Sequence, residues 1–213
     1  CKIIKCKKPK YLMMENVKNL VGCNHKENFL KFLDYLESLG YKNSWTVLNA
    51  RDYGVPQNRE RVFCISELNG EKKFEFPKPI KLKFKLYDIL EENVDERYYL
   101  RNGQVMDRPI EQEYSYCLDS NYWKGVTLKS FLEKHRRQLV TDKVNEAGQY
   151  VPRRLTPKET WRLMGVSEED IEKASLLISR TSLYKQSGNS IVVAVLEAIF
   201  QKLFADKSYR GVR

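Results

Sequence analysis

The chain has 213 residues, of which 42% are hydrophobic and 31% are charged, and this composition allows one large or two small globular domains. No apolar run approaches the roughly 20 residues that a membrane span needs. No signal-peptide pattern follows the basic first residues, so we expect an intracellular protein without a membrane partner. The net charge of +10 favours a polyanionic partner such as nucleic acid, although many proteins are basic for solubility alone.

Cysteine and histidine usage predicts neither a metal site nor a disulfide framework. The five cysteines are scattered, odd in number and form no Cys-x-x-Cys pair, and His25 and His135 lie near no cysteine cluster. Zinc sites and disulfide scaffolds need regular ligand or cysteine spacings. We therefore expect free, mostly buried thiols.

The first third of the chain reads as half of an open α/β sheet. Residues 1–8 resemble the end of a helix, and residues 10–15 form a short apolar run typical of a buried strand in a parallel sheet. Apolar side chains recur at helical spacing over residues 26–39, and residues 41–49 and 61–66 are predicted strands. The order strand, helix, strand, strand favours the α/β class.

Residues from about 68 to 149 change in character. Lysine-rich segments lead into polar, tyrosine-containing sequence with many turn residues, and only residues 128–135 show a helical pattern. We predict a small, irregular domain with a basic surface here.

Regular structure returns near the end of the chain. Thr156, Pro157 and Glu159 form a strong helix start, with an N-cap, a proline at the first helical position and a capping-box partner. Ser167 precedes three acidic residues and is predicted to open a second helix. Residues 191–204 are nearly all apolar and are predicted to form a buried helix.

Charged side chains stand at two predicted strand boundaries. Glu15 follows the first strand, and strand ends line the ligand crevice in open α/β sheets, so we expect partial burial to keep a proton available on it. Gln57, Arg59 and Arg61 alternate, which places them on one face of an extended strand. Two guanidinium groups on one face suit a base carbonyl oxygen and a phosphate. The alternatives are a glutamate that caps a loop and a solvated basic strand.

Four segments in this order resemble conserved motifs of the cytosine-5 DNA methyltransferases, namely motifs VI, VIII, IX and X: Glu15-Asn16-Val17, residues 57–61, residues 154–165 and residues 188–193. The resemblance implies the C-terminal half of a Rossmann-like, S-adenosylmethionine-dependent methyltransferase domain, together with a small target-recognition domain. It implies three segments: a partial catalytic domain (1–70), the target-recognition domain (71–152) and C-terminal helices that return to the catalytic domain (153–213).

The resemblance also assigns roles to residues. Glu15 would protonate N3 of cytosine, Arg61 would hold its O2, and Arg59 would act at the site near the DNA backbone. Asn189 and Ser190 would lie beside the methionine end of S-adenosylmethionine, and we expect Asn189 to cap the following apolar helix. Expected contacts to double-stranded DNA come from Asn16, Gln57, Arg136 and Arg137, with Lys124 and Lys129 as further candidates.

Other features of the family are missing from these residues. The sequence contains no Pro-Cys-Gln tripeptide, which carries the family's nucleophile, and no glycine-rich first cofactor motif, so the S-adenosylmethionine pocket is expected to be incomplete. We therefore expect this chain alone not to methylate DNA. Three explanations stay open: a truncated piece, one subunit of a two-chain enzyme, or a DNA-binding relic.

The prediction of half a sheet also leads to an expectation about association with another chain. Half a sheet would expose an unpaired edge, which predicts either a partner chain with the N-terminal half, a homodimer or a marginally stable monomer. By resemblance, the biological setting would be restriction-modification in the cytoplasm of a bacterial or phage-infected cell.

Overall fold

The computed structural model describes residues 2–101 and 103–205, and these form two compact units. Among the described residues, unit 1 comprises residues 2–49, 60–79 and 195–205, and unit 2 comprises residues 50–59, 80–101 and 103–194. This division differs from the three segments predicted from the sequence, because residues 153–194 belong with unit 2. Cys1 and residues 206–213 belong to predicted segments but lie outside the described residues.

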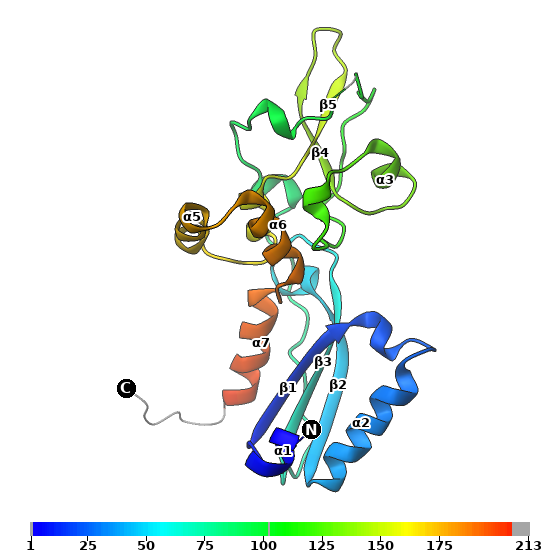
Figure 1. Cartoon of the computed structure of the whole chain (residues 1–213), viewed down its shortest axis with the longest axis vertical. Helices are drawn as coiled ribbons and strands as arrows, with labels where there is room; N and C mark the ends of the chain where they lie inside the picture. Colours follow the sequence, from blue (N-terminus) through cyan, green and yellow to red (C-terminus); the bar gives the residue numbers. More distant parts are fainter. Residues whose placement is uncertain (1, 102, 206–213) are drawn as a thin grey trace. The chain divides into compact units, whose positions relative to one another are not determined.

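Unit 1 contains a three-stranded sheet with the strand order β1-β3-β2, shown in Figure 1. Its elements are α1 (Lys2–Lys7), β1 (Tyr11–Val17), α2 (Lys26–Ser38), β2 (Tyr41–Asn49), β3 (Glu60–Leu68) and most of α7 (Val193–Phe204). The central strand β3 runs antiparallel to both neighbours. The α/β class is confirmed, but the purely parallel arrangement predicted for this sheet is wrong.

Strand β1 also differs from its prediction as a buried strand. None of its residues is buried, and Met13 and Val17 are 36% and 51% exposed. The strand lies at one edge of the sheet, where only β3 pairs with it among the described residues. It also continues two residues beyond Glu15, so this carboxylate lies within the strand and not at its end.

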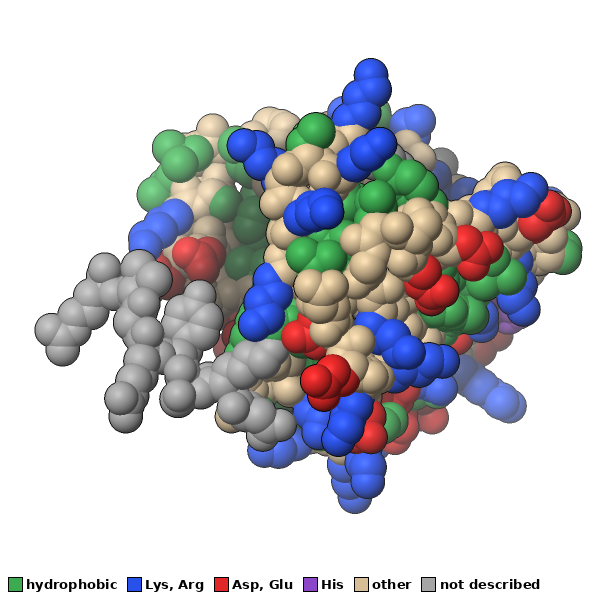
Figure 2. Space-filling view, turned by 90° about the horizontal axis from the view of Figure 1, so that it is seen from below, with side chains coloured by type: hydrophobic (Ala, Val, Ile, Leu, Met, Phe, Trp, Pro, Cys, Tyr) green, Lys and Arg blue, Asp and Glu red, His purple; other side chains and the backbone are tan. Residues whose placement is uncertain are grey.

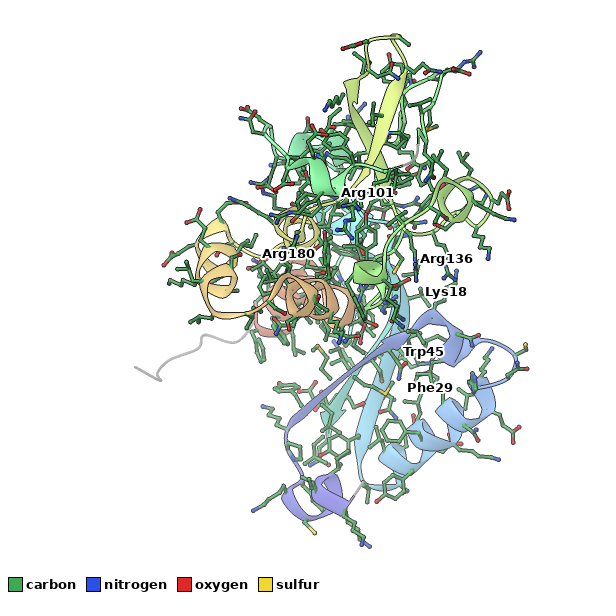
Figure 3. The ribbon with its side chains drawn as sticks, turned by 45° about the horizontal axis from the view of Figure 1, so that its top comes forward. Lys18, Phe29, Trp45, Arg101, Arg136 and Arg180 are labelled. Atoms are coloured by element: carbon green, nitrogen blue, oxygen red, sulfur yellow. The ribbon has the colours of Figure 1, made fainter. Side chains whose placement is uncertain are left out.

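Helix α2 and strand β3 form the core of unit 1. Phe29 and Leu33 of α2 pack with Val62 and Cys64, which alternate on one face of β3. Figure 3 shows Phe29 against Trp45 of β2, with ring centroids 5.3 Å apart in an edge-to-face arrangement. The helical spacing predicted for residues 26–39 and the predicted strand at residues 41–49 are both confirmed.

Unit 2 joins short helices to a two-stranded hairpin. Its elements are α3 (Leu128–Leu132), β4 (Leu139–Val144), β5 (Tyr150–Arg154), α4 (Pro157–Arg162), α5 (Glu168–Leu177) and α6 (Arg180–Asn189), with 3-10 turns between them. Thr156 accepts a hydrogen bond from the Glu159 amide, and the Ser167 hydroxyl accepts one from the Asp170 amide. Both predicted helix starts are therefore confirmed.

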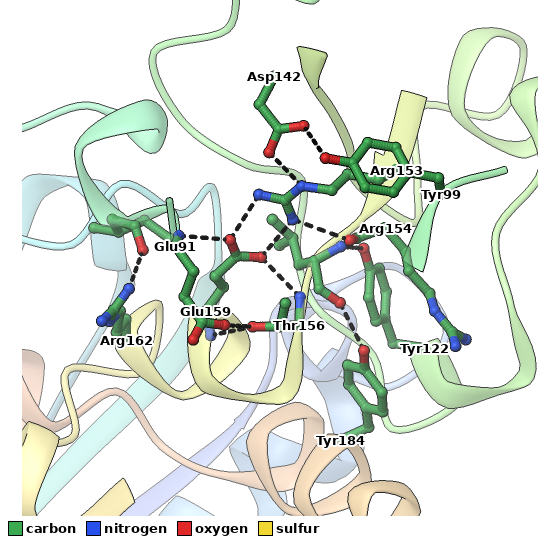
Figure 4. A network of polar contacts seen from close by, with 12 residues as sticks. Glu91, Tyr99, Tyr122, Asp142, Arg153, Arg154, Thr156, Glu159, Arg162 and Tyr184 are labelled. Atoms are coloured by element: carbon green, nitrogen blue, oxygen red, sulfur yellow. Dashed lines mark hydrogen bonds and ion pairs between the residues drawn. The ribbon is translucent and has the colours of Figure 1, made fainter. Parts of the chain in front are cut away.

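A buried ion pair holds the hairpin to helix α4 (Figure 4). Both guanidinium nitrogens Nη1 and Nη2 of Arg153 donate to the Glu159 carboxylate at 2.8 Å, and neither side chain is exposed. Asp142 accepts a further bond from Arg153 Nε. Burial alone would lower the pKa of Arg153, but the hydrogen bonds and charges of Glu159 and Asp142 outweigh it and raise this pKa.

The stretch Arg180–Phe204 is long and apolar enough, by length and composition alone, to cross a membrane. The structure divides it into α6 and α7. Leu183 and Tyr184 of α6 and Val195 and Ile199 of α7 are buried, and helices of globular proteins can have the same length and composition. The length of this stretch is therefore weak support for a membrane span.

Basic side chains are spread over the face shown in Figure 2. Lysine and arginine project in several directions there, and aspartate and glutamate lie between them. The net charge of +10 is therefore not gathered into one basic patch on this face. A DNA-contacting surface has to be argued from individual residues.

Candidate functional site

Glu15 and Arg61 form a partly buried ion pair on the sheet of unit 1. Arg61 Nε lies 3.2 Å from Glu15 Oε1, and the two side chains are 17% and 19% exposed. Arg61 Nη1 also donates to the backbone carbonyl of Glu60 at 2.8 Å. The pair therefore presents a guanidinium group and a carboxylate side by side, each still reachable by a ligand.

The antiparallel register explains why these two residues meet. Val17 pairs with Arg61 and Glu15 pairs with Phe63, so Glu15 and Arg61 are diagonal neighbours on one face. In a parallel pair, the last residues of one strand and the first residues of the other would lie at opposite ends of the two strands. The antiparallel pairing of β1 with β3, which the sequence did not predict, is therefore the feature that brings Glu15 and Arg61 together.

Asn16 lies next to Glu15 on the other face of β1. Its side chain is exposed, and its Oδ1 accepts a hydrogen bond from the Val17 amide at 2.8 Å. The expected DNA contact of Asn16 stays a prediction, since the amide nitrogen is at the surface and suited to donate.

Gln57 and Arg59 do not share a strand face with Arg61, because β3 begins only at Glu60. Gln57 is fully buried in unit 2, where Nε2 donates to the Leu163 carbonyl at 2.7 Å and Oε1 accepts from the Leu118 amide at 3.1 Å. Both the donor and the acceptor of the Gln57 side-chain amide are thus hydrogen-bonded to backbone groups. The direct DNA contact expected of Gln57 does not fit this burial, and the geometry gives it a structural role.

Arg59 is only 3% exposed and binds backbone carbonyls. Its guanidinium donates to Leu118 at 2.8 Å, to Gly188 at 2.9 Å and to Ser190 at 2.8 Å. A cation that satisfies carbonyls at the end of helix α6 stabilises that terminus. Arg59 therefore holds the turn that follows α6, and the role near the DNA backbone that the sequence predicted for it stays a prediction.

Residues 188–190 end helix α6, whereas the sequence predicted that Asn189 would begin the next helix. Asn189 is the last residue of α6, and Ser190 follows it as the C-cap. Asn189 is exposed, and its side-chain amide bonds no other residue in the described part of the chain. A polar ligand group beside this turn could therefore bind the Asn189 amide, which fits the amino-acid end of a cofactor.

Gly188 allows a close backbone approach within unit 2. A Cβ atom at this position would lie 2.3 Å from the Ser120 nitrogen and 2.4 Å from the Asp119 carbonyl carbon. We expect Gly188→Ala to lower the free energy of unfolding by about 2 kcal/mol, because backbone must move to relieve the overlap. Urea denaturation measures this change. The control Thr181→Ala in the same helix should change stability by less than about 0.5 kcal/mol, and an equal effect of both would contradict the packing argument.

The expected DNA contacts of unit 2 differ in how available they are. Arg136 is exposed, whereas Arg137 is half-buried and donates from Nη1 to the Gly125 carbonyl at 2.7 Å. Lys124 lies over the ring of Trp123, and Lys129 pairs with Glu133 at 3.9 Å. Arg136 is therefore the better candidate for a phosphate contact, and Arg137 helps to hold its own loop.

Sequence reasoning missed the segment around Leu118, whose amide and carbonyl bind Gln57 and Arg59. It also missed helix α6 and the hairpin of β4 and β5. A turn signal was present for the hairpin, because Asn145 and Gly148 lie between its strands. No local signal marks Leu118, since its partners are about 60 residues away in the chain.

The family comparison agrees with the motifs. A family model described as C-5 cytosine-specific DNA methylase matches residues 1–205. The chain is 67% identical over 204 residues to the type II methyltransferase M2.ScrFI of Lactococcus lactis subsp. cremoris, covering 96% of this chain and 57% of that protein. It is 32% identical to M.SsoII of Shigella sonnei, covering 96% of this chain and 55% of that protein. The chain thus spans little more than half the length of these relatives.

Solved structures agree with the fold. The chain matches the Dnmt2 methyltransferase of S. pombe with a TM-score of 0.67 and 23% identity, over 92% of this chain and 68% of that one. It matches the Entamoeba histolytica methyltransferase EhMeth with the same TM-score and 20% identity, over 93% and 63%. At these identities the likeness concerns the fold alone. The family model over nearly the whole sequence, supported by the 67% identical relative, shows that the chain belongs to the C-5 cytosine-specific DNA methylase family.

Proposed function

We propose that the chain forms the cytosine-holding and DNA-contacting part of a cytosine-5 DNA methyltransferase of the restriction-modification type. The observation that carries this proposal is the Glu15–Arg61 pair, with 3.2 Å between carboxylate and guanidinium. The family membership and the match to type II methyltransferases support it. The setting would be the cytoplasm of a bacterial or phage-infected cell.

The chemistry of cytosine suits this pair. Along one edge the base carries O2 and N3 as acceptors and N4 as a donor. The Arg61 guanidinium would donate to O2, while a protonated Glu15 would donate to N3 and its other oxygen would accept from N4. A proton delivered to N3 draws electrons from the ring and eases nucleophilic attack at C6. Glu15 is therefore the general acid in this proposal, and Arg61 orients the base.

The methyl donor of the family is S-adenosylmethionine, which supplies the methyl group when it is bound. The residues of this chain that fit it are Asn189 and Ser190, because the turn after α6 presents an exposed amide. Arg59 would support this site indirectly, since it binds the carbonyls of Gly188 and Ser190.

We further propose that methyl transfer needs residues beyond this sequence. No Pro-Cys-Gln loop is present to supply a nucleophile, so the chain alone should not methylate DNA. Among the described residues only β3 pairs with the edge strand β1, so a chain that carries further strands, or a second copy, could add to that edge. The alternative function is DNA binding without chemistry, which the net charge of +10 equally supports.

A hybrid protein tests these proposals. Residues 1–205 would replace the matching part of the Lactococcus lactis methyltransferase, which leaves the unmatched part of that protein intact. We expect the hybrid to transfer tritiated methyl groups from S-adenosylmethionine to DNA, and we expect the 213-residue chain alone to transfer none. A folded hybrid that binds DNA without methyl transfer would favour the DNA-binding alternative.

A further inference from the structure

Unit 2 contains a pocket that none of the roles above uses. Its volume is about 310 Å³, and its lining residues are Asn58, Glu111, Gln112, Glu113, Tyr114 and Tyr116. Backbone bonds fix its walls together: the Asn58 amide donates to the Ser115 carbonyl, and the Ser115 amide donates to the Pro56 carbonyl, both at 2.8 Å. The pocket is therefore a built feature and not a gap between loose loops.

A buried glutamine sets the orientation of Gln112. Gln138 is fully buried, and its Oε1 must face the Tyr116 amide, which donates to it at 2.8 Å. Its Nε2 then donates to Gln112 Oε1 at 2.6 Å. The oxygen of Gln112 is thus occupied, and the Nε2 group of Gln112, which bonds no residue in the described part of the chain, is presented as a donor.

Two tyrosines give the pocket aromatic surfaces. Arg51 lies over the Tyr114 ring at 5.0 Å from its centroid. The Tyr116 ring packs against Phe131, and its hydroxyl lies 3.1 Å from His135 Nδ1. Rings held in this way can stack with a nucleobase at little cost in side-chain entropy.

The charges of the pocket select a base over a phosphate. Glu111 and Glu113 line the pocket wall. Glu113 forms an ion pair with Lys85 at 2.9 Å, whereas Glu111 forms none in the described part of the chain, and an unpaired carboxylate repels the DNA backbone. A carboxylate suits two neighbouring N–H donors, and among the DNA bases only guanine has such a pair, N1–H and N2–H, on its pairing edge. The next atom on that edge, O6, is an acceptor, which matches the Gln112 donor.

We propose that this pocket binds an unstacked guanine of the DNA through its pairing edge. Gln112 donates to O6, Glu111 accepts from N1 and N2, and the exposed Tyr114 stacks on the ring. This inference rests on the proposed function in one respect, namely that DNA is the partner. It does not require methyl transfer. It makes the segment at residues 111–116 a determinant of sequence specificity.

Binding of short single strands to the 213-residue chain tests the pocket. The probes are fluorescein-labelled pentadeoxynucleotides with thymine at four positions and guanine, adenine, cytosine or thymine at the centre, measured by fluorescence anisotropy. We expect the guanine probe to bind at least about fivefold more tightly than the all-thymine probe. Hypoxanthine, which lacks the N2 amino group, should lose most of this preference, whereas 7-deazaguanine, which keeps the pairing edge, should retain it.

Matched variants locate the preference. Gln112→Glu keeps the acceptor for Gln138 but removes the donor, so it should abolish the preference for guanine, as should Tyr114→Ala. Gln104→Glu makes the same charge change at a glutamine of unit 2 that does not line the pocket, and it should leave the preference intact. Equal binding of all four probes would overturn the inference. So would a preference that survives Gln112→Glu or Tyr114→Ala, or one that is lost equally in Gln104→Glu. None of these outcomes depends on whether the hybrid methylates DNA.

Discussion

Replacing Glu15 with glutamine is expected to slow methyl transfer by the hybrid about 10²–10⁴-fold, which is the range for loss of a general acid. Glutamine keeps the size and hydrogen-bonding atoms of the side chain but cannot deliver a proton to N3. Affinity for DNA should change little, because phosphate contacts dominate it. Single-turnover transfer of tritium, measured beside DNA affinity, separates the two effects.

The control for this substitution is Glu27→Gln on helix α2. Glu27 is exposed and pairs with Lys31 one turn away at 2.7 Å, so its removal should leave the transfer rate within a factor of two. A rate for Glu15→Gln within about threefold of the unsubstituted hybrid would contradict the role assigned to Glu15.

Replacing Arg153 with methionine is expected to lower the free energy of unfolding by about 3–5 kcal/mol, because the buried Glu159 loses its countercharge. Both side chains of this pair are fully buried. Glu159 would retain hydrogen bonds from the Thr156 and Glu91 amides at 2.7 and 2.9 Å, but these donors carry no full charge. Urea denaturation, followed by far-ultraviolet circular dichroism, measures the loss.

A second variant separates the uncompensated charge from lost packing. Arg153→Met combined with Glu159→Gln removes both charges and should be less destabilised than Arg153→Met alone. Lys173→Ala, which breaks an exposed pair with Glu169, should change stability by less than about 1 kcal/mol. A loss below about 1 kcal/mol for Arg153→Met would contradict the buried-pair argument.

The helices that the sequence predicted well are those with strong local signals. Apolar side chains at helical spacing marked α2, and side-chain caps at Thr156 and Ser167 marked α4 and α5. Helix α6 was missed because its second half, residues 185–189, is polar and contains Gly188, so it resembles a turn. Its apolar contacts come from only a few positions, among them Leu183 and Tyr184.

Strand direction and side-chain partners could not be predicted in the same way. The apolar run at residues 10–15 gives the same pattern in a parallel or an antiparallel sheet, and only the register with β3 brings Glu15 to Arg61. The alternation of Gln57, Arg59 and Arg61 predicted a common face, but alternation holds only within a strand. Arg59 and Gln57 precede β3, and their partners at residues 118, 163 and 188 are distant in the sequence.

The family motifs identified the family of the chain, and the structure adds where the side chains of one motif lie. The four motifs predicted the family that the comparisons show. Within the second motif, however, Arg61 lies beside Glu15, whereas Arg59 binds backbone carbonyls. A motif shows which residue types occur together in the sequence. The structure shows which of these side chains a ligand can reach and which bind backbone groups.

A charge swap of the Glu15–Arg61 pair in the hybrid tests the central claim most directly, by measuring methyl transfer and stability together. Glu15→Arg and Arg61→Glu should each destabilise the protein, since each places like charges side by side, and the double variant should recover stability. We predict that the double variant stays below about 1% of the original transfer rate, because acid and guanidinium then face the wrong atoms of cytosine. Recovery of methyl transfer to within about tenfold, together with stability, would show that the pair only joins two strands and would contradict the account.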